Sequence, residues 1–298
     1  YPHSYVRSCS VAKDSFDDKA TYSFNIEVNK NVQVICGGVL DSITNNDSSN
    51  TYHYHIPQMI SPYLCSLTIA NFKTYTSTIH SIYGGDIPLV VHYISGDSLT
   101  IRDCFSRVPQ GFNALEKEFG RFRFNRVGYC VTPRGSMEHV DNISLAEGVV
   151  TDTNLSEQSN IIHELAHSWF GNLITCKNQE EMWLNEGWTS FTTRISLEAM
   201  YGEKKAKDYF RTENEKVIKN LPLDEGYLSV YGIDSTMTYS STVYNKGAMV
   251  AQTLRGMLGD SLFSCSVKDM LDTFAFKNVT SIQVRDFLTQ RTGINLTP

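Results

Sequence analysis

The chain has 298 residues, of which 41% are hydrophobic, with a formal net charge of −6 and a sequence pI near 5.8. This length allows one large domain, or one domain and part of another, and the hydrophobic content suffices for a buried core. The acidic balance excludes the basic surface of a nucleic-acid-binding protein, so no nucleic-acid partner is expected. The longest apolar run, 87–94, is too short for a transmembrane segment.

The N-terminus shows no basic stretch followed by an apolar one, so no signal peptide is predicted, and the compartment remains open. Seven cysteines are scattered along the chain without a C-x-x-C pair. An odd number cannot all pair within the chain, and mostly buried free thiols are the favoured interpretation.

The first 86 residues read as a β-sheet layer. Short β-rich runs occur at 20–28, 32–36, 52–56 and 64–70, and turn-rich stretches such as 44–50 separate them. Within the third run, His53 and His55 would share one face of a strand. Because no third ligand is near them in the sequence, exposed strand histidines are favoured over a metal site.

A boundary is expected at Gly84-Gly85, which gives a partial β-domain at 1–86 and a second domain at 87–298. The second domain is predicted to begin with a strand at 87–94, an amphipathic helix over 98–119 and a strand over 124–132.

The rest of the chain is predicted to be mainly helical. Asn154 and Glu157 have the spacing of a capping box, which would start a helix that carries His163 and His167. Further helices are expected at 188–200, 244–258, 261–274 and 281–292. Strands followed by a run of helices indicate the α+β class.

The segment His163-Glu164-Leu165-Ala166-His167 reads H-E-x-x-H. Residues four apart lie on one face of a helix, about 6 Å apart along its axis, so both imidazoles can reach one metal ion. Glu164 would then lie near the metal without binding it, which suits a general base acting on a metal-bound water.

A third ligand is expected from a second carboxylate or imidazole, and Glu186 in Trp183-Leu184-Asn185-Glu186-Gly187 is the candidate. Two helices folded as a hairpin would bring it to the metal. A catalytic site with one Zn²⁺ per chain is favoured over a surface helix with two unrelated histidines.

Three sequence blocks closely resemble the gluzincin aminopeptidases, the family of aminopeptidase N and the leukotriene epoxide hydrolase. The first runs from His163 to Glu186, with eighteen residues between His167 and Glu186 as in the family. The others are the loop at 135–139 and the tyrosine block at 239–247. The resemblance covers roughly 88–298 and implies a thermolysin-like catalytic domain behind the partial β-domain.

The resemblance also implies roles for individual residues. Tyr244 would donate a hydrogen bond to the developing oxyanion, and Tyr239 would form a wall of the site. Glu138 would bind the α-ammonium group of the substrate, while Gly135 and Ser136 would let the loop backbone approach an extended peptide. The expected partners are therefore peptides with a free N-terminus.

Three positions depart from the family pattern. His139 stands where the family usually has Asn, and Thr193 stands where many relatives have a carboxylate that supports a ligand. Thr236 replaces an Asp of the leukotriene branch, which argues against an epoxide hydrolase. The family also implies more of the N-terminal domain and a helical C-terminal domain, both of which would complete the site.

The leading interpretation is a zinc metallo-aminopeptidase. A thermolysin-type endopeptidase would leave Glu138 without a role, and a non-catalytic domain that retains zinc would not need Glu164 or Tyr244. The sequence does not indicate the preferred N-terminal residue or the oligomeric state.

Overall fold

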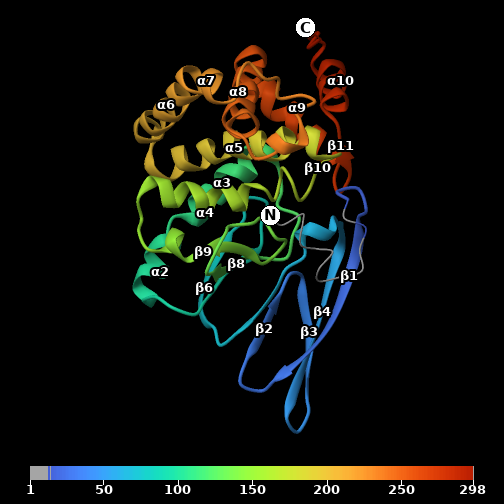
Figure 1. Ribbon diagram of the computed structural model, residues 1–298, viewed down its shortest axis with the longest axis vertical. Helices are drawn as coiled ribbons and strands as arrows, with labels where there is room; N and C mark the ends of the chain where they lie inside the picture. The colour runs from blue at the N-terminus through green and yellow to red at the C-terminus, as the bar shows by residue number, and fades with distance from the viewer. Residues whose placement is uncertain (1–12, 14, 298) are drawn as a thin grey trace. The chain divides into compact units, whose positions relative to one another are not determined.

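The computed structural model describes residue 13 and residues 15–297, and the chain divides into two compact units. The first unit comprises 1–109 and 123–165, and the second comprises 110–122 and 166–298. Figure 1 shows that the strands of the larger sheets come from the first half of the chain, whereas the second half is mainly helical. The α+β class predicted from the sequence is confirmed.

The first unit begins with two small antiparallel sheets. One has the strand order β1-β4-β3, formed by Ala20–Asn29, Ser49–Ile60 and Val39–Asn45, and the other pairs β2 (Gln33–Cys36) with β5 (Leu67–Ala70). Alternate residues of β1 turn toward a core of buried residues, which include Val34 and Tyr54. The hairpin between β3 and β4 turns at the stretch predicted as a turn.

The second sheet of this unit contains four strands in the order β6-β7-β8-β9. Strands β6 and β7 are antiparallel, whereas β7, β8 and β9 run parallel to one another. Their bounds are Lys73–His80, Asp86–Tyr93, Val127–Thr132 and Ile143–Ala146. Five of the six residues of β8 are buried, as expected for a strand in the middle of a parallel arrangement.

The helix expected over 98–119 is wrong as a single element. The structure has α2 (Ser98–Phe105) and then α3 (Val108–Phe119). Pro109 is the physical reason, because proline lacks an amide hydrogen and is tolerated only in the first turn of a helix. The chain therefore stops α2 and starts a new helix with Pro109 as its second residue.

The second unit consists mainly of helices. Those longer than ten residues, other than α3, are α5 (Trp183–Tyr201), α6 (Glu203–Lys219), α8 (Gly247–Leu258), α9 (Asp260–Thr273) and α10 (Ser281–Thr292). Shorter elements are α7 (Leu221–Asp224), the π-helical turn η5 (Thr242–Lys246), and the parallel strand pair β10 (Thr175–Cys176) and β11 (Asn278–Val279). The expected helix at 281–292 is confirmed in its bounds, whereas α5 begins five residues before the expected start.

His53 and His55 lie on β4, as expected, but both are half-buried rather than exposed. Each has partners on a neighbouring strand: His53 bonds Asn25 at 2.6 Å and Thr44 at 3.0 Å, and His55 bonds Asp41 at 2.8 Å. These contacts stabilise the sheet.

The expectation of free thiols is confirmed for the cysteines that the structure describes. Cys36, Cys104, Cys130 and Cys176 are buried, Cys65 is half-buried and Cys265 is exposed. Cys9 lies outside the described residues. None of the helices in the described part of the chain combines the length and the apolar character that a membrane span needs.

Candidate metal centre

Helix α4 (Leu155–Ala166) starts at the predicted cap. Asn154 Oδ1 accepts a hydrogen bond from the amide of Glu157 at 3.0 Å, which is the N-cap half of the expected capping box. The amide of Asn154 itself donates to Asp152 Oδ1 at 3.0 Å, so the aspartate takes the place expected for the Glu157 side chain.

The last turn of α4 and the residue that follows it carry the H-E-x-x-H motif. His163 is half-buried and Glu164 is buried, and the helix ends at Ala166, directly before His167. Because one helix turn separates the two histidines, their side chains project from the same face. His163, His167 and Glu186 form one group of side chains able to hold a metal ion.

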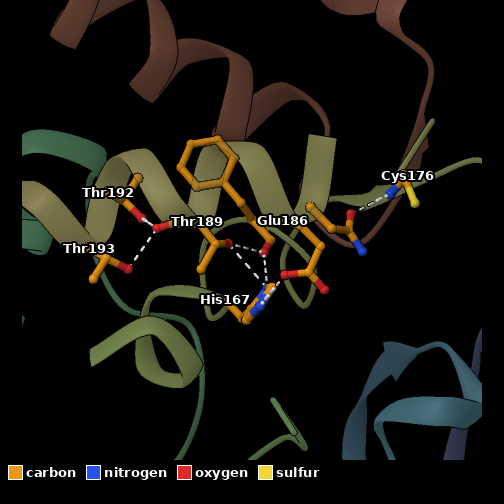
Figure 2. A network of polar contacts seen from close by, with 8 residues as sticks. His167, Cys176, Glu186, Thr189, Thr192 and Thr193 are labelled. Carbon is orange, nitrogen blue, oxygen red and sulfur yellow. Dashed lines mark hydrogen bonds and ion pairs between the residues drawn. The ribbon is translucent and has the colours of Figure 1, made fainter. Parts of the chain in front are cut away.

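Both ring nitrogens of His167 have defined neighbours. Nδ1 lies 2.8 Å from the carbonyl oxygen of Phe170, and Nε2 lies 3.1 Å from Oε2 of Glu186 (Figure 2). A carbonyl oxygen can only accept a hydrogen bond, so Nδ1 carries a proton. A second partner of Nδ1 is the hydroxyl of Thr189, at 3.1 Å.

The chemistry of these donors fits a bound cation. When the ring of His167 is neutral with its proton on Nδ1, the lone pair of Nε2 points toward a carboxylate oxygen of Glu186. A buried Nε2 and a carboxylate oxygen 3.1 Å apart need either a proton or a metal ion between them, and His163 is available to a metal ion as a further ligand. Imidazole nitrogen and carboxylate oxygen are ligands that Zn²⁺ takes in catalytic sites.

Helix α5 positions Glu186 through its neighbours. Asn185 Oδ1 accepts the amide of Cys176 at 2.8 Å, which attaches the first turn of α5 to strand β10. The ring of Trp188 stacks on Phe170 with centroids 4.9 Å apart, and it also stacks on Phe263 at 6.0 Å. These buried aromatic contacts hold the turn that carries Glu186 beside the turn that follows His167.

The loop between β8 and β9 carries the residues expected to bind substrate. Met137 forms an antiparallel bridge with Ser144, and Ser136 Oγ accepts the amide of Ala146 at 3.2 Å. Gly135 has a φ of +73° and open space where a side chain would be. Glu138, the residue after the bridge, is buried with 5% exposure.

The next residues fix this loop to the rest of the first unit. Asp141 has a φ of +59°, and its buried carboxylate accepts hydrogen bonds from Asn125 and from the amide of Arg126. His139, the departure from the family pattern, bonds Ser144 at 3.1 Å, and loss of hydration lowers the pKa of its ring to about 4. His139 therefore holds the loop as a neutral side chain, through its hydrogen bond with Ser144.

The two tyrosines of the third block lie in the second unit. Tyr244 is half-buried in η5, and Tyr239 is 38% exposed in the segment before it. Element η5 packs against α5, since a Cβ added to Gly187 would lie 3.0 Å from the carbonyl oxygen of Val243. The turn that carries Tyr244 is therefore adjacent to the turn that carries Glu186.

Sequence reasoning did not identify the surroundings of His167 Nδ1. The Phe170 carbonyl carries no sequence signal, because every residue has one. Gly171 was a usable signal: its φ is +124°, and an added Cβ would lie 2.9 Å from Nδ1 of His167. Thr189 was another, because it lies three residues after Glu186 and shares its helix face.

The sequence model of the peptidase family M1 domain matches residues 134–297, more than half of the 298 residues. Among curated proteins, the chain is 22% identical to "Probable aminopeptidase 2" of Sulfurisphaera tokodaii, a match over 98% of the chain and 40% of the relative. It is 26% identical to "Leucine aminopeptidase 2" of Yarrowia lipolytica over 95% of the chain and 45% of the relative. The chain thus spans less than half the length of these relatives.

Solved structures share the fold. The M1 zinc metallopeptidase from Deinococcus radiodurans superposes with a TM-score of 0.84 at 16% identity, covering 96% of this chain and 64% of that one. Legionella pneumophila aminopeptidase A in complex with aspartic acid gives a TM-score of 0.82 at 17% identity, over 95% of this chain and 34% of that one.

Proposed function

Because the chain belongs to peptidase family M1, as its sequence blocks predicted, we propose that it supplies the active site of a zinc aminopeptidase that removes N-terminal residues from peptides. The observation that carries the proposal is the contact between His167 Nε2 and Glu186 Oε2, at 3.1 Å, with Nδ1 of the same ring held by a carbonyl. Both atoms are basic, buried and directed at one another, as ligands of a shared cation are.

His163, His167 and Glu186 would hold one zinc ion per chain. When bound, zinc would supply Lewis acidity, which lowers the pKa of a water molecule and polarises a peptide carbonyl. Helix α4 and the residue that follows it would position the two imidazoles, and the hydrogen bond from Nδ1 to the Phe170 carbonyl would leave Nε2 of His167 as the ligand atom.

Glu164 would act as the general base. Its carboxylate is buried, with 8% exposure, and it follows His163 on the same helix turn. An oxygen of this carboxylate would accept the proton of the attacking water and deliver it to the nitrogen of the leaving amine. Burial would keep bulk water from competing for that proton.

Tyr244 would donate its hydroxyl hydrogen to the oxyanion that develops on the peptide carbonyl. An oriented donor of this kind contributes about 3–4 kcal/mol to catalysis in other hydrolases. The packing of η5 against α5 supports this role, because it gives the tyrosine a fixed backbone position beside Glu186. Tyr239, which is partly exposed, would form a wall of the substrate site.

Glu138 would bind the α-ammonium group of the substrate and so make cleavage depend on a free N-terminus. A carboxylate that pairs with an ammonium group forms a charge-assisted hydrogen bond, which is the strong kind. The backbone of Gly135 and Ser136 would contact the peptide, and the open space at Gly135 supports close approach.

One experiment separates this function from its two alternatives. A peptide with a free amine and its N-acetylated twin are incubated with the protein, with and without a metal chelator. The aminopeptidase proposal expects chelator-sensitive cleavage of the free peptide alone. Equal cleavage of both peptides would indicate a thermolysin-type endopeptidase, and zinc binding without cleavage would indicate a non-catalytic domain.

A further inference from the structure

The hydroxyl of Thr189 takes part in a triangle of polar contacts on the side of His167 that faces away from Glu186. Its Oγ1 lies 3.1 Å from His167 Nδ1 and 3.0 Å from the carbonyl oxygen of Phe170, while Nδ1 lies 2.8 Å from the same carbonyl (Figure 2). Thr189 is fully buried, with 0% exposure. Water therefore cannot easily replace its hydroxyl.

A proton on Nδ1 satisfies all three contacts. The Phe170 oxygen accepts from both Nδ1–H and the Thr189 hydroxyl, and the lone pairs of Oγ1 face the hydrogen of Nδ1. If the ring carried its proton on Nε2 instead, the lone pair of Nδ1 would face the carbonyl oxygen at 2.8 Å. Of the two neutral tautomers, the triangle thus favours the one whose Nε2 has a lone pair for a cation.

We propose that Thr189 is a positioning residue, which holds the imidazole of His167 in the tautomer and orientation that zinc binding requires. The inference rests on the zinc site of the proposed function. It identifies the Thr189 hydroxyl, an uncharged group, as the hydrogen-bonding partner that orients the ligand His167. Outer partners of metal-binding histidines fix the ring and raise its basicity.

Two hydroxyls of the next helix turn bond the main-chain carbonyl of Thr189 and not its side chain. The Thr192 and Thr193 hydroxyls donate to the carbonyl of Thr189 at 2.9 Å and 2.8 Å. Thr193 stands where relatives were expected to have a supporting carboxylate, and here its hydroxyl is directed to the backbone of Thr189. Gly171 leaves room for the His167 ring, because any side chain there would lie against Nδ1.

Thr189→Val is the decisive variant, because it removes the hydrogen-bonding capacity of the side chain and replaces the hydroxyl with a methyl group of similar size. A methyl group at 3.1 Å from Nδ1 is also too close, so the ring must turn. Thr189→Ser keeps the hydroxyl. Thr192→Val is the matched control: Thr192 lies on the same helix, is also fully buried, and bonds a carbonyl rather than His167.

The measurement is the zinc dissociation constant, determined by competition with a chromophoric chelator. We expect Thr189→Val to raise it by about ten- to a hundredfold, the usual effect of losing an outer partner. Thr189→Ser and Thr192→Val should stay within about threefold of the unchanged protein. Equal weakening by Thr192→Val and Thr189→Val would overturn the proposal, since it would indicate a general loss of helix stability.

A second readout reports the ring directly. The ¹⁵N chemical shifts of His167 distinguish the nitrogen that carries the proton from the nitrogen that binds metal. The unchanged protein and Thr189→Ser should show a proton on Nδ1, whereas Thr189→Val should show a changed or exchange-broadened Nδ1 signal. Identical spectra for all three would refute the positioning role. Neither readout uses a peptide, so a failure of the aminopeptidase proposal would leave these results unaffected.

Discussion

Gly187 of α5 and Gly247 of α8 lie against each other backbone to backbone. A Cβ added to Gly247 would lie 2.9 Å from Cα of Gly187, and one added to Gly187 would lie 2.8 Å from Cα of Gly247. Gly187 follows the candidate ligand Glu186, and Gly247 comes three residues after Tyr244. The absence of side chains at these two positions therefore sets how closely the two candidate site residues approach.

Gly247→Ala should destabilise the protein, because the new methyl group meets backbone atoms that cannot rotate away. Overpacking of this kind costs about 1–3 kcal/mol in the free energy of unfolding. The control is Gly256→Ala on the same helix, where an added Cβ has nothing within 4 Å. That change should be neutral or stabilise by up to about 1 kcal/mol, because alanine favours helices. Chemical denaturation of both variants measures the difference, and equal stability would contradict the packing argument.

The pH dependence of folding should reflect two poorly hydrated histidines in the first unit. Loss of hydration lowers the pKa of both His92 and His139 to about 4, and the charge of Arg126 adds to the effect at His92. Between that value and the unfolded value near 6.5, the unfolded chain binds more protons than the folded one. The contribution of these rings is therefore fully present above about pH 6.5 and is lost as the pH falls toward 4.

His139→Gln should make the free energy of unfolding depend less on pH in this window. A fall in pKa from 6.5 to about 4 corresponds to about 3 kcal/mol for one ring. Between pH 7 and pH 5, the free energy of unfolding should therefore change by at least about 1 kcal/mol less in the variant than in the unchanged protein, which denaturation at the two pH values measures. A steeper dependence in the variant than in the unchanged protein would show that His139 gains a proton on folding, contrary to its surroundings.

The residues of the candidate metal centre differ in how far the sequence could predict them. His163 and His167 follow from helix periodicity, which is a local property, and Glu186 from a spacing that the family shares. The Phe170 carbonyl and the space left by Gly171 arise from the fold of the turn after the helix. Every residue has a backbone carbonyl whatever its side chain, so the sequence of side chains cannot show which carbonyl will bond His167.

The fold shows the same division. The capped helix at 281–292 and the alternating strand β1 were predicted because each has a complete local pattern. Strand β3 was missed. All but its first residue are exposed, so its sequence has no regular alternation of polar and apolar residues that would predict a strand. Helix α6 was missed as well, because its sequence is rich in Lys and Glu and its apolar positions are few.

Two neighbouring residues of α4, His163 and Glu164, should differ in what their substitution removes: zinc binding in the first case and turnover in the second. His163→Ala should lower both the zinc content and the thermal stability, because a lost ligand weakens a metal that stabilises the folded state. Glu164→Gln should keep zinc at one ion per chain and reduce turnover by about 10²–10⁴-fold, as expected for a general base. Elemental analysis and peptide hydrolysis measure the two effects. Loss of zinc from Glu164→Gln would make Glu164 a ligand and reverse the assignment.

Glu138 should decide between removal of N-terminal residues and internal cleavage. Its carboxylate is buried in the loop after β8, where a hydrogen bond to a charged partner is worth about 1.5–3 kcal/mol. Glu138→Ala should therefore lower kcat/KM for free-amine peptides by about ten- to a hundredfold, with zinc content unchanged.

The same change should have little effect on N-acetylated peptides, which have no ammonium group to bind, so the preference for free peptides should narrow. Glu138→Gln, which keeps the shape and removes the charge, should behave like the alanine variant if charge is what matters. The measurement is kcat/KM for a matched pair of free and acetylated peptides with each variant. An undiminished preference for the free peptide in both variants would assign recognition of the N-terminus to another residue.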